Sequence, residues 1–376
     1  MSNPLHELNA RGQSIWYDNL NRELIRTGAL RRMVDEDAVT GGTSNPSIFE
    51  KAVGSSDAYD DDIRALASAG KSTEEVFDAL TIKDIQLCCD LFSSVYERTD
   101  AADGYCSLEV SPEIAYDGEV SARDAKRLFA ALSRPNAMIK IPGTQQGLQA
   151  VENCLTAGLN INITLLFGVE NYEQVALAYI RALERRVQAG ESIDRIASVA
   201  SFFISRVDTL IDQRLDAAGR MDLAGNAGVA NAKIAYAKFK EIFSGERWEA
   251  LALKGARVQR PLWASTSTKN PSYRDVIYVE ELIGPHTINT MPQVTLDAFR
   301  DHGVVRDSIE ENVNDAFAHV EALRNAGVEL REVTDELQTQ GVDLFADSFH
   351  KAFETVRVKC DAMRTSAVGS ERAGGG

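Results

Sequence analysis

Short apolar runs alternate with longer amphipathic stretches along most of the chain. Eight of these runs have the length and apolar content of buried strands, and the spacing after most of them leaves room for a helix. The predicted strands are residues 14–18, 38–43, 105–110, 137–141, 159–164, 197–202, 261–265 and 287–290. This alternation predicts an α/β fold, and 376 residues fit one large α/β barrel with additions better than two medium domains.

Several stretches between the strands carry apolar residues every three or four positions, as helices with one buried face do. Residues 144–157, 172–188 and 207–220 are the clearest examples. Ser121, followed by Asp124, resembles a capping box and predicts that another helix begins there. We therefore expect a helix after most of the strands.

Two regions are larger than a simple barrel requires. Residues 207–259 are helical in pattern and too long for one crossover, and residues 304–364 look like two helices. No linker of biased composition and no repeat of fixed period divides the chain. We expect a barrel domain over 1–303 that includes the helical insertion at about 207–259, with 304–364 as its helical extension. The glycine-ended segment 365–376 is predicted to be a flexible tail.

The charge balance limits the kinds of partner. Forty Lys and Arg residues stand against 56 Asp and Glu residues, which gives a net charge of −16, and the basic residues are scattered. Nucleic acid is therefore not an expected partner, because phosphate backbones need concentrated cations. A few cations can still form a local site for a small anion. The same net charge disfavours loose self-association, and we expect a monomer or a homodimer.

Cysteine usage and apolar run lengths indicate the compartment. Five cysteines, an odd number without a CxxC pair, are typical of a reduced chain. The first residues lack the basic and apolar pattern of a signal peptide, and no apolar run approaches the roughly 18 residues that span a bilayer. These features predict a cytoplasmic protein without a membrane partner.

The most distinctive polar residue is a lysine inside an apolar strand. Lys140 lies in the run Ala-Met-Ile-Lys-Ile over residues 137–141, which a Pro-Gly break follows. Desolvation at such a place favours the neutral amine and lowers the lysine pKa. A neutral amine can attack a ketone and form a Schiff base. The segment alone leaves open that Lys140 points outward or pairs with a carboxylate.

Other polar residues stand near the carboxyl ends of predicted strands, where barrel active sites lie. Asp18, Glu109 and Thr164 could supply acid–base or hydroxyl groups there, although each alone is more typical of a structural hydrogen bonder. The sequence Thr-Ser-Asn-Pro-Ser over residues 43–47 also follows a strand, and its composition alone is typical of a turn. If the strands close into a barrel, all these residues meet at one mouth.

Two hydroxyl-rich segments are candidates for phosphate binding. Ser201 is followed five residues later by Arg206 near a predicted helix start, and the loop after the seventh strand carries Ser265 and Lys269. Hydroxyls, helix-start amides and a cation together bind phosphate well, although each segment alone is also typical of a surface loop. No Walker motif or GxGxxG supports nucleotide binding.

Metal and serine-hydrolase chemistry find no support in the motifs. The five histidines are dispersed, without His-x-x-x-His or a Cys/His cluster, so we expect no metal and no cofactor. No Gly-x-Ser-x-Gly elbow is present.

Taken together and in this order, the motifs resemble those of the transaldolases, in their longer bacterial form. The resemblance covers roughly residues 14–295 and rests on 43–47, on Ile-Lys-Ile-Pro-Gly-Thr at 139–144, on Asn-Ile-Asn-Ile-Thr-Leu at 160–165, and on Ser201 with Arg206. It implies a (β/α)8 TIM barrel with extra helices and an enzyme of the non-oxidative pentose phosphate pathway. The implied reaction moves a dihydroxyacetone unit from sedoheptulose 7-phosphate to glyceraldehyde 3-phosphate, giving erythrose 4-phosphate and fructose 6-phosphate.

The resemblance also implies catalytic roles. Lys140 matches the Schiff-base lysine, and Asp18 matches the group that takes the proton from the C4 hydroxyl of the donor as the C3–C4 bond breaks. Glu109, with Thr164 and a water, matches the group that moves protons while the carbinolamine forms and dehydrates.

The implied binding residues follow from the same motifs. Asn45 and Asn162 match residues that hold the lysine-bound three-carbon fragment, and Ser201 and Arg206 match phosphate contacts.

One departure concerns a second phosphate cation. Many transaldolases carry an arginine in an Ala-Ser-x-Arg context, whereas residues 264–269 read Ala-Ser-Thr-Ser-Thr-Lys. The second cation is therefore either absent or supplied in a shifted register by Lys269, in the same loop as Ser265. Lysine binds phosphate as a point charge, without the fork of arginine.

Two alternatives stay open beside the transaldolase prediction. One is a Schiff-base aldolase that releases free dihydroxyacetone; a tyrosine in place of Glu109 would have favoured it. The other is a catalytically silent barrel that binds a metabolite or a partner protein through its helical additions.

Overall fold

Eight parallel strands close into a barrel in sequence order, with β1 hydrogen-bonded to β8. The computed structural model describes residues 3–373, and their side chains as far as residue 364. The strands are β1 (Gln13–Tyr17), β2 (Val39–Thr43), β3 (Cys106–Glu109), β4 (Ala137–Pro142), β5 (Ile161–Leu166), β6 (Ser198–Phe203), β7 (Arg260–Ala264) and β8 (Thr287–Met291). Each lies within two residues of its predicted place, and the predicted (β/α)8 TIM barrel with extra helices is confirmed.

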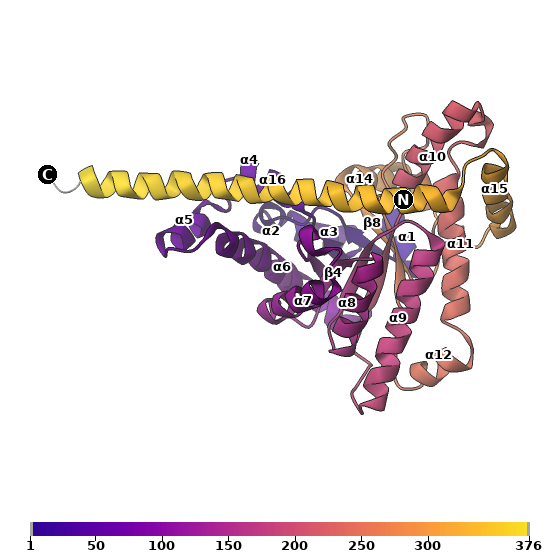
Figure 1. Ribbon diagram of the computed structural model, residues 1–376, viewed down its shortest axis with the longest axis horizontal. Coiled ribbons are helices and arrows are strands. Elements are labelled where there is room, and N and C mark those ends of the chain that lie inside the picture. Colours follow the sequence, from indigo (N-terminus) through magenta and orange to yellow (C-terminus); the bar gives the residue numbers. More distant parts are fainter. Residues whose placement is uncertain (1–2, 374–376) are drawn as a thin grey trace.

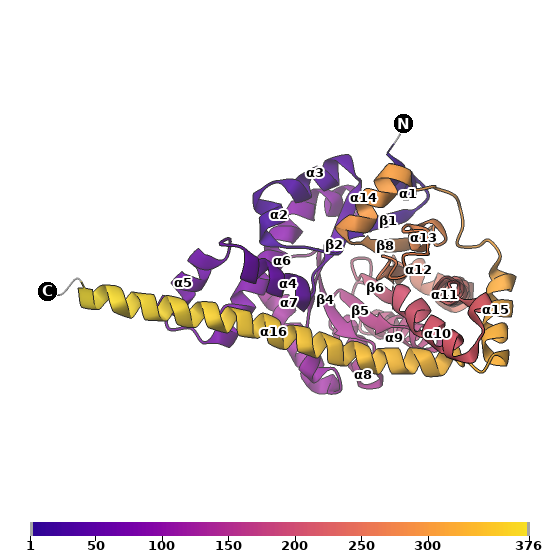
Figure 2. The same ribbon diagram turned by 90° about the horizontal axis from the view of Figure 1, so that it is seen from above.

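Helices surround the barrel and extend it on one side (Figures 1 and 2). They are α1 (Pro4–Ala10), α2 (Arg22–Arg26), α3 (Ala29–Glu36), α4 (Pro46–Ser55), α5 (Asp60–Ser68), α6 (Thr73–Arg98), α7 (Gly118–Leu132), α8 (Gln145–Thr156), α9 (Val169–Gln188), α10 (Ser205–Ala218), α11 (Ala227–Ile242), α12 (Gly245–Ala252), α13 (Ile277–Glu280), α14 (Gln293–His302), α15 (Val313–Asn325) and α16 (Leu330–Ala373), with 3-10 turns η1 (Pro112–Ile114) and η2 (Met221–Leu223). No helix within the described residues is both long and apolar enough to cross a membrane.

Alternation along the strands separates two environments. In β4, Ile139 and Ile141 pack outward among the apolar faces of the helices. Lys140 lies between them and points into the barrel. Met138 is two residues earlier on that inner face and belongs to a second apolar cluster, with Trp16, that closes the barrel below the lysine. The polar layer therefore rests on apolar side chains and faces the cavity at the carboxyl ends of the strands.

The start of α7 differs from the prediction. Asp117 caps this helix, accepting a hydrogen bond from the backbone N–H of Val120 at 3.0 Å, so the helix begins at Gly118. The capping box predicted at Ser121 is wrong, because Asp117 supplies the cap one turn earlier and Ser121 Oγ instead donates to the carbonyl of Ile114 at 2.7 Å.

The C-terminal helix α16 has 44 residues and continues well past the barrel (Figure 1). It passes η1 and the end of β5, then packs on α4, α5 and α6. Val356 and Cys360 lie in the apolar cluster that it shares with Phe49 and Val53 of α4. The tail predicted over 365–376 is wrong as far as residue 373, since a single glycine, at position 369, interrupts helix-compatible residues there; residues 374–376 lie outside the described part.

Candidate active site

Strand register brings three polar residues side by side inside the barrel. Glu109 of β3 pairs in register with Lys140 of β4, which pairs with Asn162 of β5. Lys140 Nζ lies 3.1 Å from Glu109 Oε2, and the two side chains are only 7% and 5% exposed. Lys140 therefore points inward and pairs with a carboxylate, within reach of the cavity above it.

Burial dominates the electrostatics of Glu109. It raises the pKa of the carboxyl, and the nearby charge of Lys140 opposes this rise. Both carboxyl oxygens lack a well-aligned hydrogen-bond donor among the described residues, and so does the buried Oγ1 of Thr164. Glu109 also borders a second cavity of about 110 Å³, which is separate from the main one. Unsatisfied buried oxygens of this kind favour a small polar ligand or a water at this point.

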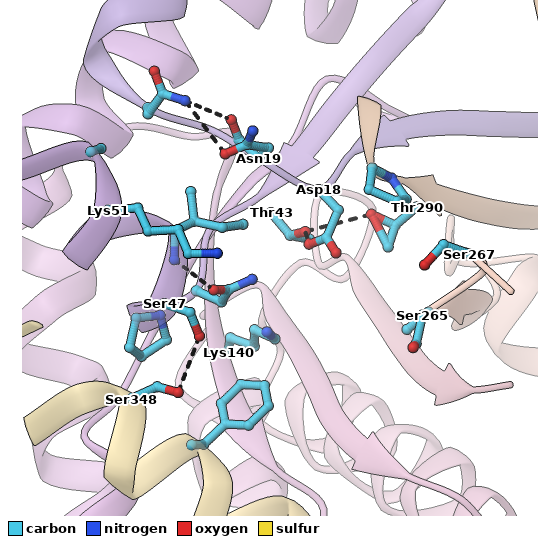
Figure 3. A pocket seen from close by; sticks show the side chains of 18 of the residues that line it. Asp18, Asn19, Thr43, Ser47, Lys51, Lys140, Ser265, Ser267, Thr290 and Ser348 are labelled. Atoms are coloured by element: carbon cyan, nitrogen blue, oxygen red, sulfur yellow. Dashed lines mark hydrogen bonds between the residues drawn. The ribbon is translucent and has the colours of Figure 1, made fainter. Parts of the chain in front are cut away.

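Asp18 directly follows β1 and lies beside Thr43 at the cavity (Figure 3). Its Oδ1 accepts a hydrogen bond from Thr43 Oγ1 at 2.8 Å, and this hydroxyl is 3.5 Å from Thr290 Oγ1. Burial raises the pKa of Asp18, while the charge of Lys140 and the hydrogen bond from Thr43 counteract the rise. A carboxyl with a raised pKa is suited to exchanging protons near neutral pH.

Asn162 is held by two hydroxyls. Its Nδ2 donates to Ser107 Oγ at 3.0 Å, and its Oδ1 accepts from Ser201 Oγ at 2.7 Å. Ser201 is 2% exposed and lines the cavity. Its predicted phosphate contact stays a prediction.

The Thr-Ser-Asn-Pro segment combines a strand end with a helix start. Asn45 caps α4, accepting a hydrogen bond from the backbone N–H of Ile48 at 3.0 Å, and Pro46 occupies the first helical position. Capping occupies Asn45 Oδ1, and Asn45 also lines the cavity. The motif is both a structural junction and part of the site.

A cavity of about 1260 Å³ connects these groups with the predicted phosphate residues. Arg206 borders it at the start of α10, half-buried, with its guanidinium 5.8 Å from the ring of Phe203. Burial lowers the pKa of Arg206, and no carboxylate within the described residues pairs with it. Lys269 Nζ donates to Ser267 Oγ at 2.8 Å, in the loop that follows the neighbouring strand β7. An unpaired, half-buried cation in a cavity is an anion site.

Ser265, the last predicted phosphate residue, adopts a left-handed backbone conformation with φ of 57°. Its hydroxyl lies 2.8 Å from that of Ser205, the first residue of α10. The structure therefore gathers all ten predicted site residues around one cavity: Asp18, Asn45, Lys140, Thr164, Ser201, Arg206, Ser265 and Lys269 line it, and Glu109 and Asn162 contact lining residues.

The comparisons with known proteins agree with this arrangement. The sequence model of the Transaldolase/Fructose-6-phosphate aldolase family matches residues 15–356. The chain belongs to this family. Transaldolase 2 of Nostoc punctiforme is 46% identical over 376 residues, which cover 96% of this chain and 99% of that protein. The transaldolase of Acidothermus cellulolyticus is 46% identical over 352 residues (93% and 95%), and that of Mycobacterium bovis is 43% identical over 362 residues (95% and 97%). The predicted transaldolase identity, and with it a transferase activity, is confirmed.

Within this transaldolase fold, the sequence did not reveal what α16 contributes. Phe345 and Ser348 border the cavity, and Ser47 Oγ donates to Ser348 Oγ at 3.1 Å (Figure 3). Lys51 of α4 points into the same space and was also missed. The apolar spacing of 304–364 predicted helices, but not where along the rim the last one passes.

Proposed function

We propose that Lys140 carries the transaldolase reaction as a Schiff base, with sugar phosphates as donor and acceptor. The observation that supports this most is the pairing of a buried lysine with a buried carboxyl at the floor of a large cavity. A second carboxyl, Asp18, and an unpaired cation, Arg206, line the same cavity. An amine and an anion site in one cavity suit a phosphorylated ketose that binds with its carbonyl toward Lys140.

In the first step, the neutral amine of Lys140 adds to the C2 carbonyl of sedoheptulose 7-phosphate. Glu109 moves one proton from the nitrogen to the oxygen, which gives the neutral carbinolamine, and then donates a second proton to the carbinolamine hydroxyl, which leaves as water while Glu109 becomes ionised. The buried hydroxyl of Thr164 holds that water against the carboxyl. The product is an iminium between Lys140 and C2.

In the second step, Asp18 removes the proton of the C4 hydroxyl. The C3–C4 bond breaks, its electron pair moves through C3 toward the iminium nitrogen, and erythrose 4-phosphate leaves as the aldehyde. The enamine then attacks the aldehyde carbon of glyceraldehyde 3-phosphate, and Asp18 returns its proton to the new hydroxyl. Hydrolysis of the second iminium releases fructose 6-phosphate and restores the free Lys140 amine.

The binding residues act at the two ends of the donor. Asn45 and Asn162 hold the hydroxyls of the three-carbon fragment, and Ser201 keeps the Asn162 amide in place through its hydrogen bond. Arg206 and Lys269 bind the phosphate, with the hydroxyl of Ser265 between their loops.

A second candidate is an aldolase that releases free dihydroxyacetone, since the family also contains fructose-6-phosphate aldolases. The residue beside Lys140 favours transfer, because it is Glu109 and not the tyrosine that would have indicated such an aldolase. The silent-barrel alternative has no observation in its favour, as the site residues are assembled around one cavity.

The test is a transfer assay with fructose 6-phosphate and erythrose 4-phosphate, followed through the sedoheptulose 7-phosphate formed. Lys140→Arg keeps the charge beside Glu109 but cannot form the imine, and we expect no transfer with it. Lys254→Arg, an exposed lysine outside the cavity, is the matched control. Transfer by Lys140→Arg at a rate near that of the wild type would overturn the proposal.

The reaction would run in the cytoplasm, and five free cysteines, all buried, support a reducing compartment. The expected monomer or homodimer stays a prediction.

A further inference from the structure

Phe345 places an aromatic ring against the catalytic lysine from outside the barrel. The centre of the ring is 5.2 Å from Lys140 Nζ, within the range in which an aromatic face attracts a cation. Phe345 belongs to α16, which is not one of the eight βα units. The lysine amine thus lies close both to Glu109 of its own sheet and to an aromatic ring of the C-terminal helix.

The helix that carries Phe345 is anchored on both sides of it. Gln338 Nε2 donates to the carbonyl of Gly143, directly after β4, at 3.0 Å and to that of Leu165, near the end of β5, at 3.1 Å. Beyond Phe345, Ser348 binds Ser47, and His350 lies 2.7 Å from Glu113 of η1. These contacts tie the ring to the strand ends, so its place above the lysine is fixed by the fold.

A transaldolase has to keep its three-carbon enamine from water until the acceptor arrives. The competing path consumes one water: C3 of the enamine takes a proton to give the iminium, water adds to C2, and the C–N bond breaks. Dihydroxyacetone leaves, and Lys140 recovers its amine. The proton that adds to C3 and the water that adds to C2 both come from solvent. A nonpolar ring beside the nitrogen therefore slows their approach to the adduct.

We propose that Phe345 is a specificity-determining residue, which favours transfer over release of dihydroxyacetone by shielding the Lys140 adduct from water. The proposal rests on the Schiff-base function above. The ring covers the nitrogen with carbon atoms, and its face stabilises the cationic iminium without offering a proton. The C-terminal helix therefore contributes a wall to the site, although it lies far along the chain from the strand motifs.

The test compares Phe345→Ala with Val358→Ala, an exposed apolar position on the same helix and away from the cavity. Two rates are measured with fructose 6-phosphate: free dihydroxyacetone formed without acceptor, and sedoheptulose 7-phosphate formed with erythrose 4-phosphate. We expect the ratio of release to transfer to rise at least tenfold in Phe345→Ala and to stay at the wild-type value in Val358→Ala. Phe345→Leu keeps most of the nonpolar cover and should give an intermediate ratio of release to transfer. This variant also tests the proposal if Phe345→Ala is unstable.

Two outcomes separate failure of the inference from failure of the proposed function. If the wild type forms an adduct on Lys140 that borohydride traps, and Phe345→Ala and Phe345→Leu leave the ratio unchanged, the shielding role is wrong and the Schiff base stands. If the wild type forms no such adduct, the proposed function itself fails. A purely structural role for Phe345 would lower both rates together and leave their ratio where it was.

Discussion

Glu109 Oε2 lies 3.1 Å from Lys140 Nζ, on the neighbouring strand and in the same register, with both side chains almost fully buried. Burial of two opposite charges stabilises little by itself, because desolvation offsets their attraction. The pair matters for the chemistry, because the lysine that forms the imine has its proton acceptor already in place. The account of the site depends on this pair.

Replacing Glu109 by Gln keeps its shape and removes its proton-accepting charge. We expect formation of the Lys140 adduct to slow by roughly 10²- to 10⁴-fold, the range typical of a lost general acid–base. The measurement is the rate at which the borohydride-trapped adduct appears after mixing with fructose 6-phosphate. Glu119→Gln, an exposed glutamate on α7, is the control. Adduct formation at the wild-type rate in Glu109→Gln would remove this carboxyl from the mechanism.

Asp18 sets the acidic limb of the pH–rate profile. The carboxyl has to be ionised to accept the C4 proton, and its raised pKa means that activity is lost as pH falls through a value above that of an ordinary aspartate. The hydrogen bond from Thr43 favours the ionised form. Thr43→Val should therefore move the acidic limb of kcat/KM to higher pH. A limb that stays in place, or moves lower, would show that another group titrates there.

Arg206 should contribute to the binding of phosphorylated donors in particular. Removing a hydrogen bond to a charged group costs about 1.5–3 kcal/mol. We expect Arg206→Ala to raise KM for fructose 6-phosphate by roughly 10- to 100-fold with a small change in kcat. Lys269→Ala should do less, because lysine offers a point charge. If Arg206→Ala raised KM for unphosphorylated fructose by the same factor, a phosphate role for Arg206 would be contradicted.

A buried carboxyl outside the cavity links stability to pH. Asp208 accepts hydrogen bonds from the backbone N–H of Gly228 and from Tyr278, and burial raises its pKa to about 6. Between the ordinary aspartate value and that pKa the folded protein binds more protons than the unfolded chain, so stability falls as pH rises through this window. The loss over the whole window should be on the order of 3 kcal/mol.

Asp208→Asn removes this titration. Its free energy of unfolding, measured by urea denaturation at pH 4.5 and 7.5 beside the wild type, should lack that part of the pH dependence. If the free energy of unfolding of Asp208→Asn differs between the two pH values as much as that of the wild type, the pH dependence belongs to other groups.

Local patterns were enough to predict the barrel strands and the inner lysine. In β4, apolar residues flank Lys140 on both sides in sequence, and alternation along a strand then places the lysine on the opposite face from Ile139 and Ile141. Closure of eight such strands brings Glu109 and Asp18 to the same mouth. That Glu109 and Asp18 share one mouth follows from the parallel order of the strands in the closed barrel.

The contribution of α16 could not be predicted in this way. Which residue of a long helix meets the cavity depends on the direction in which the helix leaves α15 and on contacts such as that of Gln338 with Gly143. Those contacts join positions 195 residues apart in the chain. The start of α7 shows the opposite case, in which one local residue, Asp117, overrode another plausible cap.

The most direct test of the central claim is to trap the adduct. The wild-type protein is incubated with fructose 6-phosphate, reduced with borohydride, digested and mapped by mass spectrometry. The account predicts a reduced three-carbon adduct on Lys140, which disappears when erythrose 4-phosphate is added before the reductant. A folded sample with no adduct on any lysine, or with the adduct on a lysine other than Lys140, would contradict it.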